Sequence, residues 1–185
     1  MKKVVIFASG SGSNAENLIQ LHHNKFYTVE AIFCNNEFAG VIERANRLKI
    51  PLKLFKRNEW NEVITSIKDL NPDLIILAGF LWKIPSDFIS SFNRIINIHP
   101  SLLPKFGGKG MYGMNVHQAV IDNQEKESGI TIHLVNEHYD EGEVLFQAAI
   151  TIAKGETPES LANKIHELEY QYFPEIILKE IENEK

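Results

Sequence analysis

An asparagine and a histidine stand two residues apart at the end of an apolar run, in the segment Asn97-Ile98-His99-Pro100. Residues two apart on a strand point to the same side, so Asn97 and His99 project together. Pro100 has no N–H for a sheet ladder and ends the strand just past His99. The pair offers an amide donor for a developing oxyanion and an imidazole that works as acid or base near neutral pH. We expect a catalytic site at this strand end, where ligands bind in open α/β sheets.

A turn rich in glycine and serine, Ser9-Gly10-Ser11-Gly12-Ser13-Asn14, follows the first apolar run and opens a helix. Its small residues let ligand oxygens reach the backbone, and a helix N-terminus favours an anion. We expect a phosphate site here, with the serines and Asn14 as additional donors. A merely tight turn and the dinucleotide fingerprint Gly10-x-Gly12-x-x-Ala15 are the alternatives. Ser13 and Glu16 have the capping-box spacing, which predicts where the helix starts.

Two further segments carry acidic groups that are candidates for chemistry. The turn His138-Tyr139-Asp140-Glu141-Gly142-Glu143 is rich in ionisable residues. An aspartate from this turn could reach His99 and favour the imidazolium, although a solvated loop is the simpler interpretation. Glu169 lies at the edge of a buried helical stripe, where a carboxylate either binds a substrate amine or follows the protein surface.

The composition is that of an ordinary globular protein, with 44% hydrophobic and 23% charged residues in 185. The formal charge of −5 and the absence of a basic block argue against a nucleic-acid partner. Cys34 is the only cysteine, which fits a reducing compartment, and no His-Glu-x-x-His spacing indicates a metal site. The apolar run Val4–Ala8 is too short for a signal peptide or a membrane span. We therefore expect a cytoplasmic protein with no metal and no membrane partner.

Short apolar runs alternate with amphipathic segments along the first hundred residues. This alternation predicts a doubly wound, mostly parallel sheet with helices on both faces. The expected strands are Val4–Ala8, Val29–Cys34, Leu52–Phe55, Asp73–Ala78 and a strand ending at His99. The expected helices are Asn14–His22, Gly40–Leu48, Glu59–Leu70 and a short helix after Pro85.

The pattern changes after Pro104. Lys105–Met114 holds four glycines and is typical of a mobile loop, and a helix is expected over Val116–Asp122. The segments Gly129–Val135 and Val144–Ile152 look like strands, and the connection between them is too short for a helical crossover, so they should pair antiparallel. No linker interrupts the chain, and we expect one domain over residues 1–185.

A final helix begins with Thr157 as N-cap and Pro158 at the first helical position. Apolar residues at helical spacing form its buried stripe. Pro174 lies inside this pattern and should kink or break the helix.

Taken together, these segments resemble the phosphoribosylglycinamide formyltransferase family over nearly the whole chain. The string Asn97–Pro104 with the later Asp140 is specific to folate-dependent formyltransferases. The turn Ser11–Asn14 and Glu169 favour the glycinamide ribonucleotide branch. Other matching positions are Leu77–Phe80, His117, Gly129, Thr131, His133, Gly142, Gln147, Ala148 and Phe173–Pro174.

The resemblance implies a one-carbon transferase of purine biosynthesis with a Rossmann-like formyltransferase fold. The amine of 5-phosphoribosylglycinamide would attack the formyl carbon of 10-formyltetrahydrofolate, the co-substrate. A tetrahedral oxyanion would then collapse to products without a metal. By resemblance, Asn97 and His99 hold the oxyanion and His99 transfers protons. Asp140 would support the charged imidazole and help move the amine proton.

The same resemblance implies the binding residues. Residues implied to contact the ribonucleotide are Ser11, Gly12, Ser13, Asn14 and Glu169. Residues implied to line the folate pocket are Leu81, Trp82, Lys83, Ile84, Asn97, Tyr139, Asp140, Glu141 and Gly142. The chain departs from the family at Trp82, where an arginine is common, and in the length of Lys105–Met114. We expect this loop to cover the substrate, with Lys109 at the phosphate.

Other functions stay open at this point. A sugar formyltransferase or a formyltetrahydrofolate hydrolase would share the catalytic core and differ in the acceptor. From another class, the chain could be an NAD-linked dehydrogenase or a nucleotide-binding regulatory module. The dehydrogenase is disfavoured because Asn35-Asn36 stands where the dinucleotide fold needs an acid. We expect a monomer or a weak homodimer.

Overall fold

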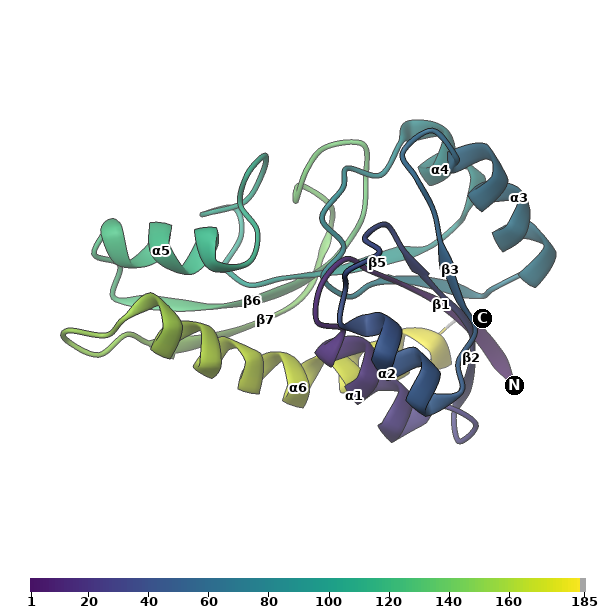
Figure 1. Cartoon of the computed structure of the whole chain (residues 1–185). Helices are drawn as coiled ribbons and strands as arrows, with labels where there is room; N and C mark the ends of the chain where they lie inside the picture. The colour runs from purple at the N-terminus through teal and green to yellow at the C-terminus, as the bar shows by residue number, and fades with distance from the viewer. Residues whose placement is uncertain (184–185) are drawn as a thin grey trace.

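A seven-stranded sheet with helices on both faces forms the protein (Figure 1), in a computed structural model that describes residues 1–183. The strand order is β3-β2-β1-β4-β5-β6-β7. The first four neighbouring pairs are parallel, while β5–β6 and β6–β7 are antiparallel. The strands are β1 (Lys2–Ala8), β2 (Tyr27–Cys34), β3 (Leu52–Leu54), β4 (Leu74–Leu77), β5 (Ile95–His99), β6 (Glu127–Leu134) and β7 (Val144–Thr151). The doubly wound, mostly parallel sheet predicted from the alternation is thus confirmed.

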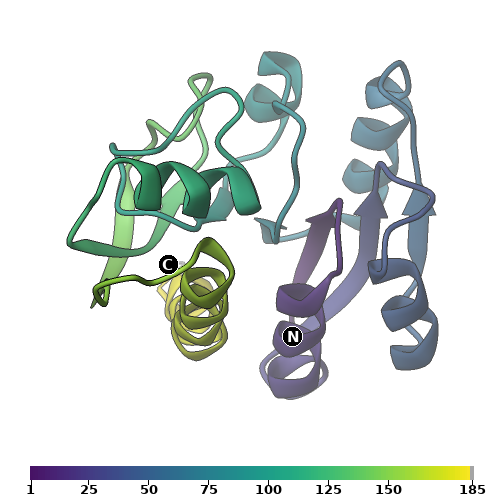
Figure 2. The ribbon, with the colours of Figure 1, turned by 60° about the vertical axis from the view of Figure 1, so that its left-hand side comes forward.

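The helices cover the two faces of the sheet in separate groups (Figures 1 and 2). They are α1 (Ser13–His22), α2 (Val41–Leu48), α3 (Trp60–Leu70), α4 (Ser86–Ser91), α5 (Met114–Asp122) and α6 (Pro158–Glu182). One core layer lies under α1, α2 and α6, and α5 packs against α6. The other layer, under α3 and α4, is built around the aromatic rings of Phe7, Phe33, Trp60 and Phe88. β4 lies within the expected strand Asp73–Ala78 and is buried along its whole length, which is typical of an unbroken apolar run in a parallel sheet.

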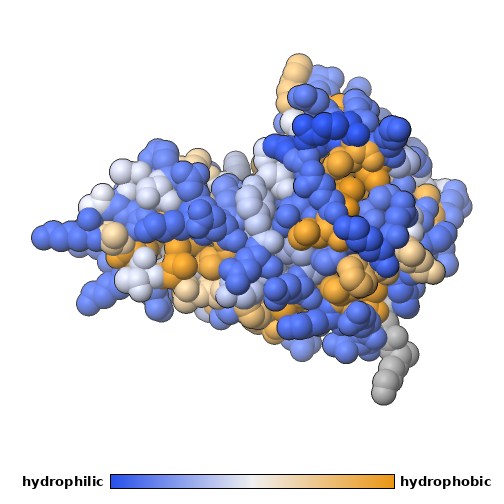
Figure 3. Space-filling view, turned by 90° about the horizontal axis from the view of Figure 1, so that it is seen from below, coloured by the Kyte–Doolittle hydropathy of each residue, from blue (hydrophilic) through white to orange (hydrophobic). Residues whose placement is uncertain are grey.

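The outer surface of the α1, α2 and α6 layer is mostly hydrophilic, with apolar side chains in scattered patches (Figure 3). None of the helices among residues 1–183 has the length and apolar character that crossing a bilayer requires.

The long helix α6 continues through Pro174, so the break that the sequence allowed is wrong, and the kink stays a prediction. Pro174 removes the N–H that would bond to the carbonyl of Tyr170, four residues earlier. That carbonyl instead accepts a hydrogen bond from Nδ2 of Asn17 on α1, at 2.9 Å. Beyond the proline, Ile177 and Ile181 are buried in the core, so packing stabilises the continued helix. In Figure 2, α6 lies between α1 and the β6–β7 part of the sheet.

The start of α1 also differs from the capping-box prediction. The helix begins at Ser13, but its N-cap is Gly12, and no side chain caps it. Glu16 turns away and forms ion pairs with Arg44 and Arg47 of α2. Gly12 has a φ of +76°, and a Cβ there would lie 2.5 Å from the side chain of Val41. Close docking of α2 therefore determines this turn, and the amide groups at the start of α1 stay uncapped.

Candidate active site

The turn that follows β5 is supported from the neighbouring strands β6 and β7. His99 pairs with Thr131 of β6 in the antiparallel register. Oγ1 of Thr131 donates to the carbonyl of Ser101 at 2.7 Å and accepts from the amide of Leu103 at 3.0 Å. Nε2 of Gln147, on β7, lies 2.9 Å from the same hydroxyl and 3.0 Å from the carbonyl of Leu103. This network holds the chain just beyond His99 in place.

Asn97 is oriented by a histidine that lies opposite it on β6. In the sheet register Asn97 pairs with His133, and Nδ2 of Asn97 lies 3.1 Å from Nε2 of His133. Nδ1 of His133 lies 2.8 Å from the carbonyl of Leu134, which can only accept, so Nδ1 carries the proton. Burial lowers the pKa of His133 and favours the neutral ring. Nε2 therefore accepts from the amide and fixes the direction of Asn97.

His133 was not singled out as a site residue from the sequence; it appeared only among the positions of family resemblance. Its strand pattern is that of a buried residue, and it is 2% exposed. The signal that finds it is the pairing register of β5 with β6, which only the fold supplies.

The aspartate of the β6–β7 turn reaches His99, as the sequence suggested. Oδ2 of Asp140 lies 3.7 Å from Nδ1 of His99, and Oδ1 lies 3.8 Å from Nε2 of His133. Asp140 itself has a φ of +56°. Gly142 packs against the carbonyl of Leu134 with no room for a Cβ, which lets the turn fold back over the sheet. The three groups proposed for catalysis, an amide, an imidazole and a carboxylate, are thus brought together.

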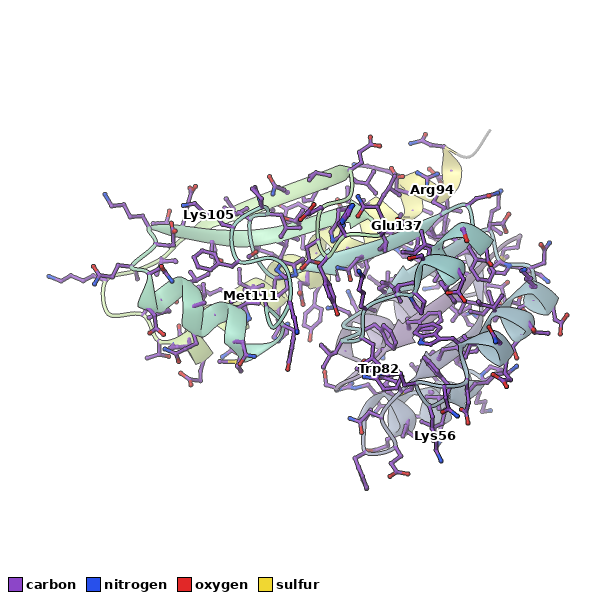
Figure 4. All side chains as sticks on the ribbon, turned by 90° about the horizontal axis from the view of Figure 1, so that it is seen from above. Lys56, Trp82, Arg94, Lys105, Met111 and Glu137 are labelled. Atoms are coloured by element: carbon purple, nitrogen blue, oxygen red, sulfur yellow. The ribbon has the colours of Figure 1, made fainter. Side chains whose placement is uncertain are left out.

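A cavity of about 540 Å³ opens beside these groups. Trp82 and Met111, both labelled in Figure 4, lie on its two sides. Of the residues implied to contact folate, those that line it are Leu81, Trp82, Lys83, Ile84, Asn97, Tyr139 and Asp140. Glu141 and Gly142 are not among the lining residues. Gly142 is explained by its packing against Leu134.

Two basic side chains lie against aromatic rings at this cavity. The guanidinium of Arg57 lies 5.0 Å from the ring centre of Trp82, and Nζ of Lys83 lies 5.7 Å from that of Tyr139. Both bases line the cavity, so an anionic part of a ligand would meet positive charge there. Lys109 lines the same cavity, from the long loop after β5.

Ser11 to Asn14 and Glu169 come together away from that cavity. Nδ2 of Asn14 donates to Oε2 of Glu169 at 2.8 Å. The same oxygen lies 2.9 Å from Nδ1 of His166, one turn earlier on α6. Glu169 is 4% exposed, and Oδ1 of Asn14 is buried without a partner among the described residues. The carboxylate at the edge of the helical stripe is therefore part of a polar cluster beside the uncapped start of α1, rather than a rim residue.

The segment after β4 ties this turn to the cavity. Oγ of Ser9 accepts from the amide of Leu81 at 2.9 Å, and the amide of Ser9 donates to the carbonyl of Gly79 at 3.0 Å. His117 of α5 is 2% exposed, and its Nδ1 has no partner among residues 1–183. Burial lowers its pKa, and its charge interactions include His166, Glu169 and His99. His117 is therefore near enough to interact electrostatically both with the cluster of Glu169 and His166 and with His99 beside the cavity.

Among the described residues, no three His, Cys, Asp or Glu side chains form a group that could hold a metal ion.

Comparison with known proteins supplies the family. The model of the family described as formyl transferase matches residues 2–177. The chain is 34% identical over 187 residues to phosphoribosylglycinamide formyltransferase of Bacillus subtilis, covering 96% of this chain and 93% of that protein. The solved structure of phosphoribosylglycinamide formyltransferase from Bacillus halodurans matches with a TM-score of 0.90 at 31% identity, covering 100% of this chain and 97% of that one.

Plant relatives are longer. The chain is 35% identical to the chloroplastic phosphoribosylglycinamide formyltransferase of Arabidopsis thaliana, over 95% of this chain. It spans 64% of that protein and 60% of the Vigna unguiculata counterpart, less than two thirds of each.

Proposed function

The chain belongs to the formyl transferase family, and we propose that it transfers the formyl group of 10-formyltetrahydrofolate to the amine of 5-phosphoribosylglycinamide. The observation that carries this proposal is the meeting of Asn97, His99 and Asp140 at one wall of a cavity. An amide donor and an imidazole suit the developing oxyanion of acyl transfer, and the carboxylate suits the positive charge that forms beside it.

In the proposed reaction, the amine nitrogen of the ribonucleotide forms a bond to the formyl carbon. Nδ2 of Asn97, directed by His133, donates to the carbonyl oxygen as it becomes an oxyanion. The bond between the formyl carbon and N10 of the folate then breaks, and one proton passes from the amine nitrogen to N10. We assign this proton transfer to His99 and Asp140, whose Nδ1 and Oδ2 lie 3.7 Å apart. The products are the formylated ribonucleotide and tetrahydrofolate.

The ribonucleotide phosphate binds at the start of α1. No side chain caps this first turn, which follows a glycine-rich segment, and the free backbone amides of such a helix start suit an anion. Glu169, held between Asn14 and His166, accepts hydrogen bonds from hydroxyl groups of the ribose. The hydrogen bond to Glu169 raises the pKa of His166, which favours positive charge on this ring next to the same carboxylate. This half-exposed histidine has no counterpart among the residues proposed from the sequence.

The folate occupies the cavity, whose volume is within the range of small-molecule sites. Its pteridine lies along the backbone of Leu81–Ile84, which needs no arginine at Trp82. The carboxylates of the folate tail meet Arg57, which lies over the ring of Trp82, and Lys83. Arg57 lies in the connection between β3 and α3. Its guanidinium supplies the positive charge that the uncharged Trp82 does not.

The test mixes the pure protein with 10-formyltetrahydrofolate and 5-phosphoribosylglycinamide and follows tetrahydrofolate release. Release that depends on the ribonucleotide is the expected result. Release without the ribonucleotide would identify a formyltetrahydrofolate hydrolase. Folate binding without release would move the acceptor to another amine, with amino sugars tested first.

A further inference from the structure

One short backbone segment, Phe106–Gly108, contacts both titratable members of the catalytic group. The carbonyl of Phe106 lies 2.8 Å from Nε2 of His99. The amide of Gly108 donates to Oδ2 of Asp140 at 2.8 Å. In Figure 1 the loop before α5 and the turn between β6 and β7 rise side by side above the sheet. The segment therefore joins two elements that are more than thirty residues apart in the chain.

The contact with Phe106 determines which nitrogen of His99 carries a proton in the neutral ring. A backbone carbonyl only accepts hydrogen bonds, so Nε2 is the donor. Nδ1, which faces Asp140 at 3.7 Å, is then left with the lone pair. Protonation of His99 places the new proton on Nδ1, between the imidazole and the carboxylate, while the bond to Phe106 stays intact.

A buried serine and a partly buried glycine hold the segment in this position. Ser101 is fully buried, and its Oγ donates to the carbonyl of Lys105 at 2.7 Å, with the carbonyl of Phe106 at 3.5 Å. Gly107 lies directly against Asp140 and Leu103. A Cβ at Gly107 would stand 3.2 Å from Cβ of Asp140 and 2.6 Å from Cδ2 of Leu103. The hydroxyl determines where the loop turns, and the missing side chain allows the loop to approach Asp140.

We infer that Nδ1 of His99 is the nitrogen that accepts and returns the transferred proton, and that Ser101 and Gly107 are positioning residues that fix it through Phe106–Gly108. The inference rests on the proposed formyl transfer for its kinetic consequences. As the amine attacks, Nδ1 takes the proton lost by the amine nitrogen, and Asp140 stabilises the resulting imidazolium. When the bond between carbon and N10 breaks, Nδ1 gives that proton to N10, so His99 ends neutral.

The kinetic test compares two buried serines. In Ser101→Ala we expect kcat to fall roughly tenfold, because the loop shifts. The KM for the ribonucleotide should stay within about twofold, because Asn14 and Glu169 lie in a separate cluster. Ser128→Ala is the matched control, since Ser128 is 2% exposed on β6 and its hydroxyl has no partner among the described residues. It should keep wild-type kcat. Gly107→Ala should lower kcat by about a hundredfold, because its Cβ displaces Asp140. Wild-type kcat in both Ser101→Ala and Gly107→Ala would overturn the positioning roles.

The decisive measurement is made on the wild-type protein and needs no turnover. Nitrogen-15 NMR of histidine-labelled wild-type protein reports the tautomer of His99, assigned by the signal that His99→Gln removes. At a pH where the ring is neutral we expect the tautomer protonated on Nε2. A ring protonated on Nδ1 would overturn the inference even if formyl transfer is observed. If formyl transfer is absent and the Nε2 tautomer is found, the proposed function fails while the geometry of the loop stands.

Discussion

Replacement of Asp140 by asparagine isolates the charge that faces His99. Asp140→Asn keeps the shape of the side chain, and its amide oxygen can still accept from Gly108. The variant removes one negative charge 3.7 Å from Nδ1 of His99, in a site where the two side chains are 12% and 5% exposed. At an effective dielectric constant near 20, two unit charges at this separation attract by about 4 kcal/mol.

In the proposed reaction His99 becomes an imidazolium only transiently, so losing this attraction raises the activation barrier and lowers kcat. A loss of about 4 kcal/mol corresponds to a roughly thousandfold fall in kcat, inside the range of about 10² to 10⁴ for general acid–base groups. The affinity for the ribonucleotide should hardly change, because Asn14 and Glu169 lie in a separate cluster.

Two measurements on one protein preparation check this prediction. Tetrahydrofolate release gives kcat, and titration calorimetry with 5-phosphoribosylglycinamide gives the dissociation constant. Asp122→Asn is the control for charge, because Asp122 is exposed on α5 and bonds only to Gln118 among the interactions described. Near-normal turnover combined with a large loss of ribonucleotide affinity would refute the assignment of Asp140 to proton movement.

Three further outcomes follow from the same contacts. His99→Ala and Asn97→Ala should be non-additive in kcat, because both groups act on one intermediate, and a double variant as slow as the sum of both effects would contradict this. The pKa of His166 is raised in the folded protein, so the protonated ring stabilises the fold fully below pH 6.5, and this stability is lost as the pH rises through the folded-state pKa. The unfolding temperatures of wild type and His166→Gln should therefore converge at alkaline pH. Asn17→Ala should destabilise the protein by about 1 kcal/mol in urea unfolding by leaving the Tyr170 carbonyl without its partner, and adding Pro174→Ala should recover the loss.

Much of the fold could be predicted because the burial of a segment is reflected in its local pattern of apolar residues. The run Leu74–Leu77 is apolar on both faces because β4 is covered on both faces. The antiparallel pairing of β6 with β7 followed from a connection too short for a crossover. The break allowed at Pro174 did not occur, because the donor that compensates for its missing N–H, Asn17, lies on another helix. A residue's own neighbours in sequence cannot show that compensation.

The site divides in the same way. Asn97 and His99 could be found from spacing, since a strand places them on one side. Glu16 had the spacing of a capping residue, but α2 brought two arginines that compete for its carboxylate. His166 has no local signal, because its role depends on Glu169 being buried against Asn14 of a distant helix. The roles of Glu16 and His166 depend on contacts with other helices, and these contacts exist only in the folded chain.

The aspartate of the β6–β7 turn is selected by its backbone as well as by its charge. Asp140 adopts a φ of +56°, a region that aspartate and asparagine tolerate better than most residues with a side chain. Such strain is of order 1–3 kcal/mol, and the bond from Gly108 and the packing of Gly142 hold the residue there. A glutamate would tolerate this conformation less well and would extend its carboxylate past Nδ1 of His99. The left-handed turn therefore favours a short acidic side chain. This explains why the carboxylate that faces His99 belongs to an aspartate in a tight turn rather than to a longer acid on a regular strand.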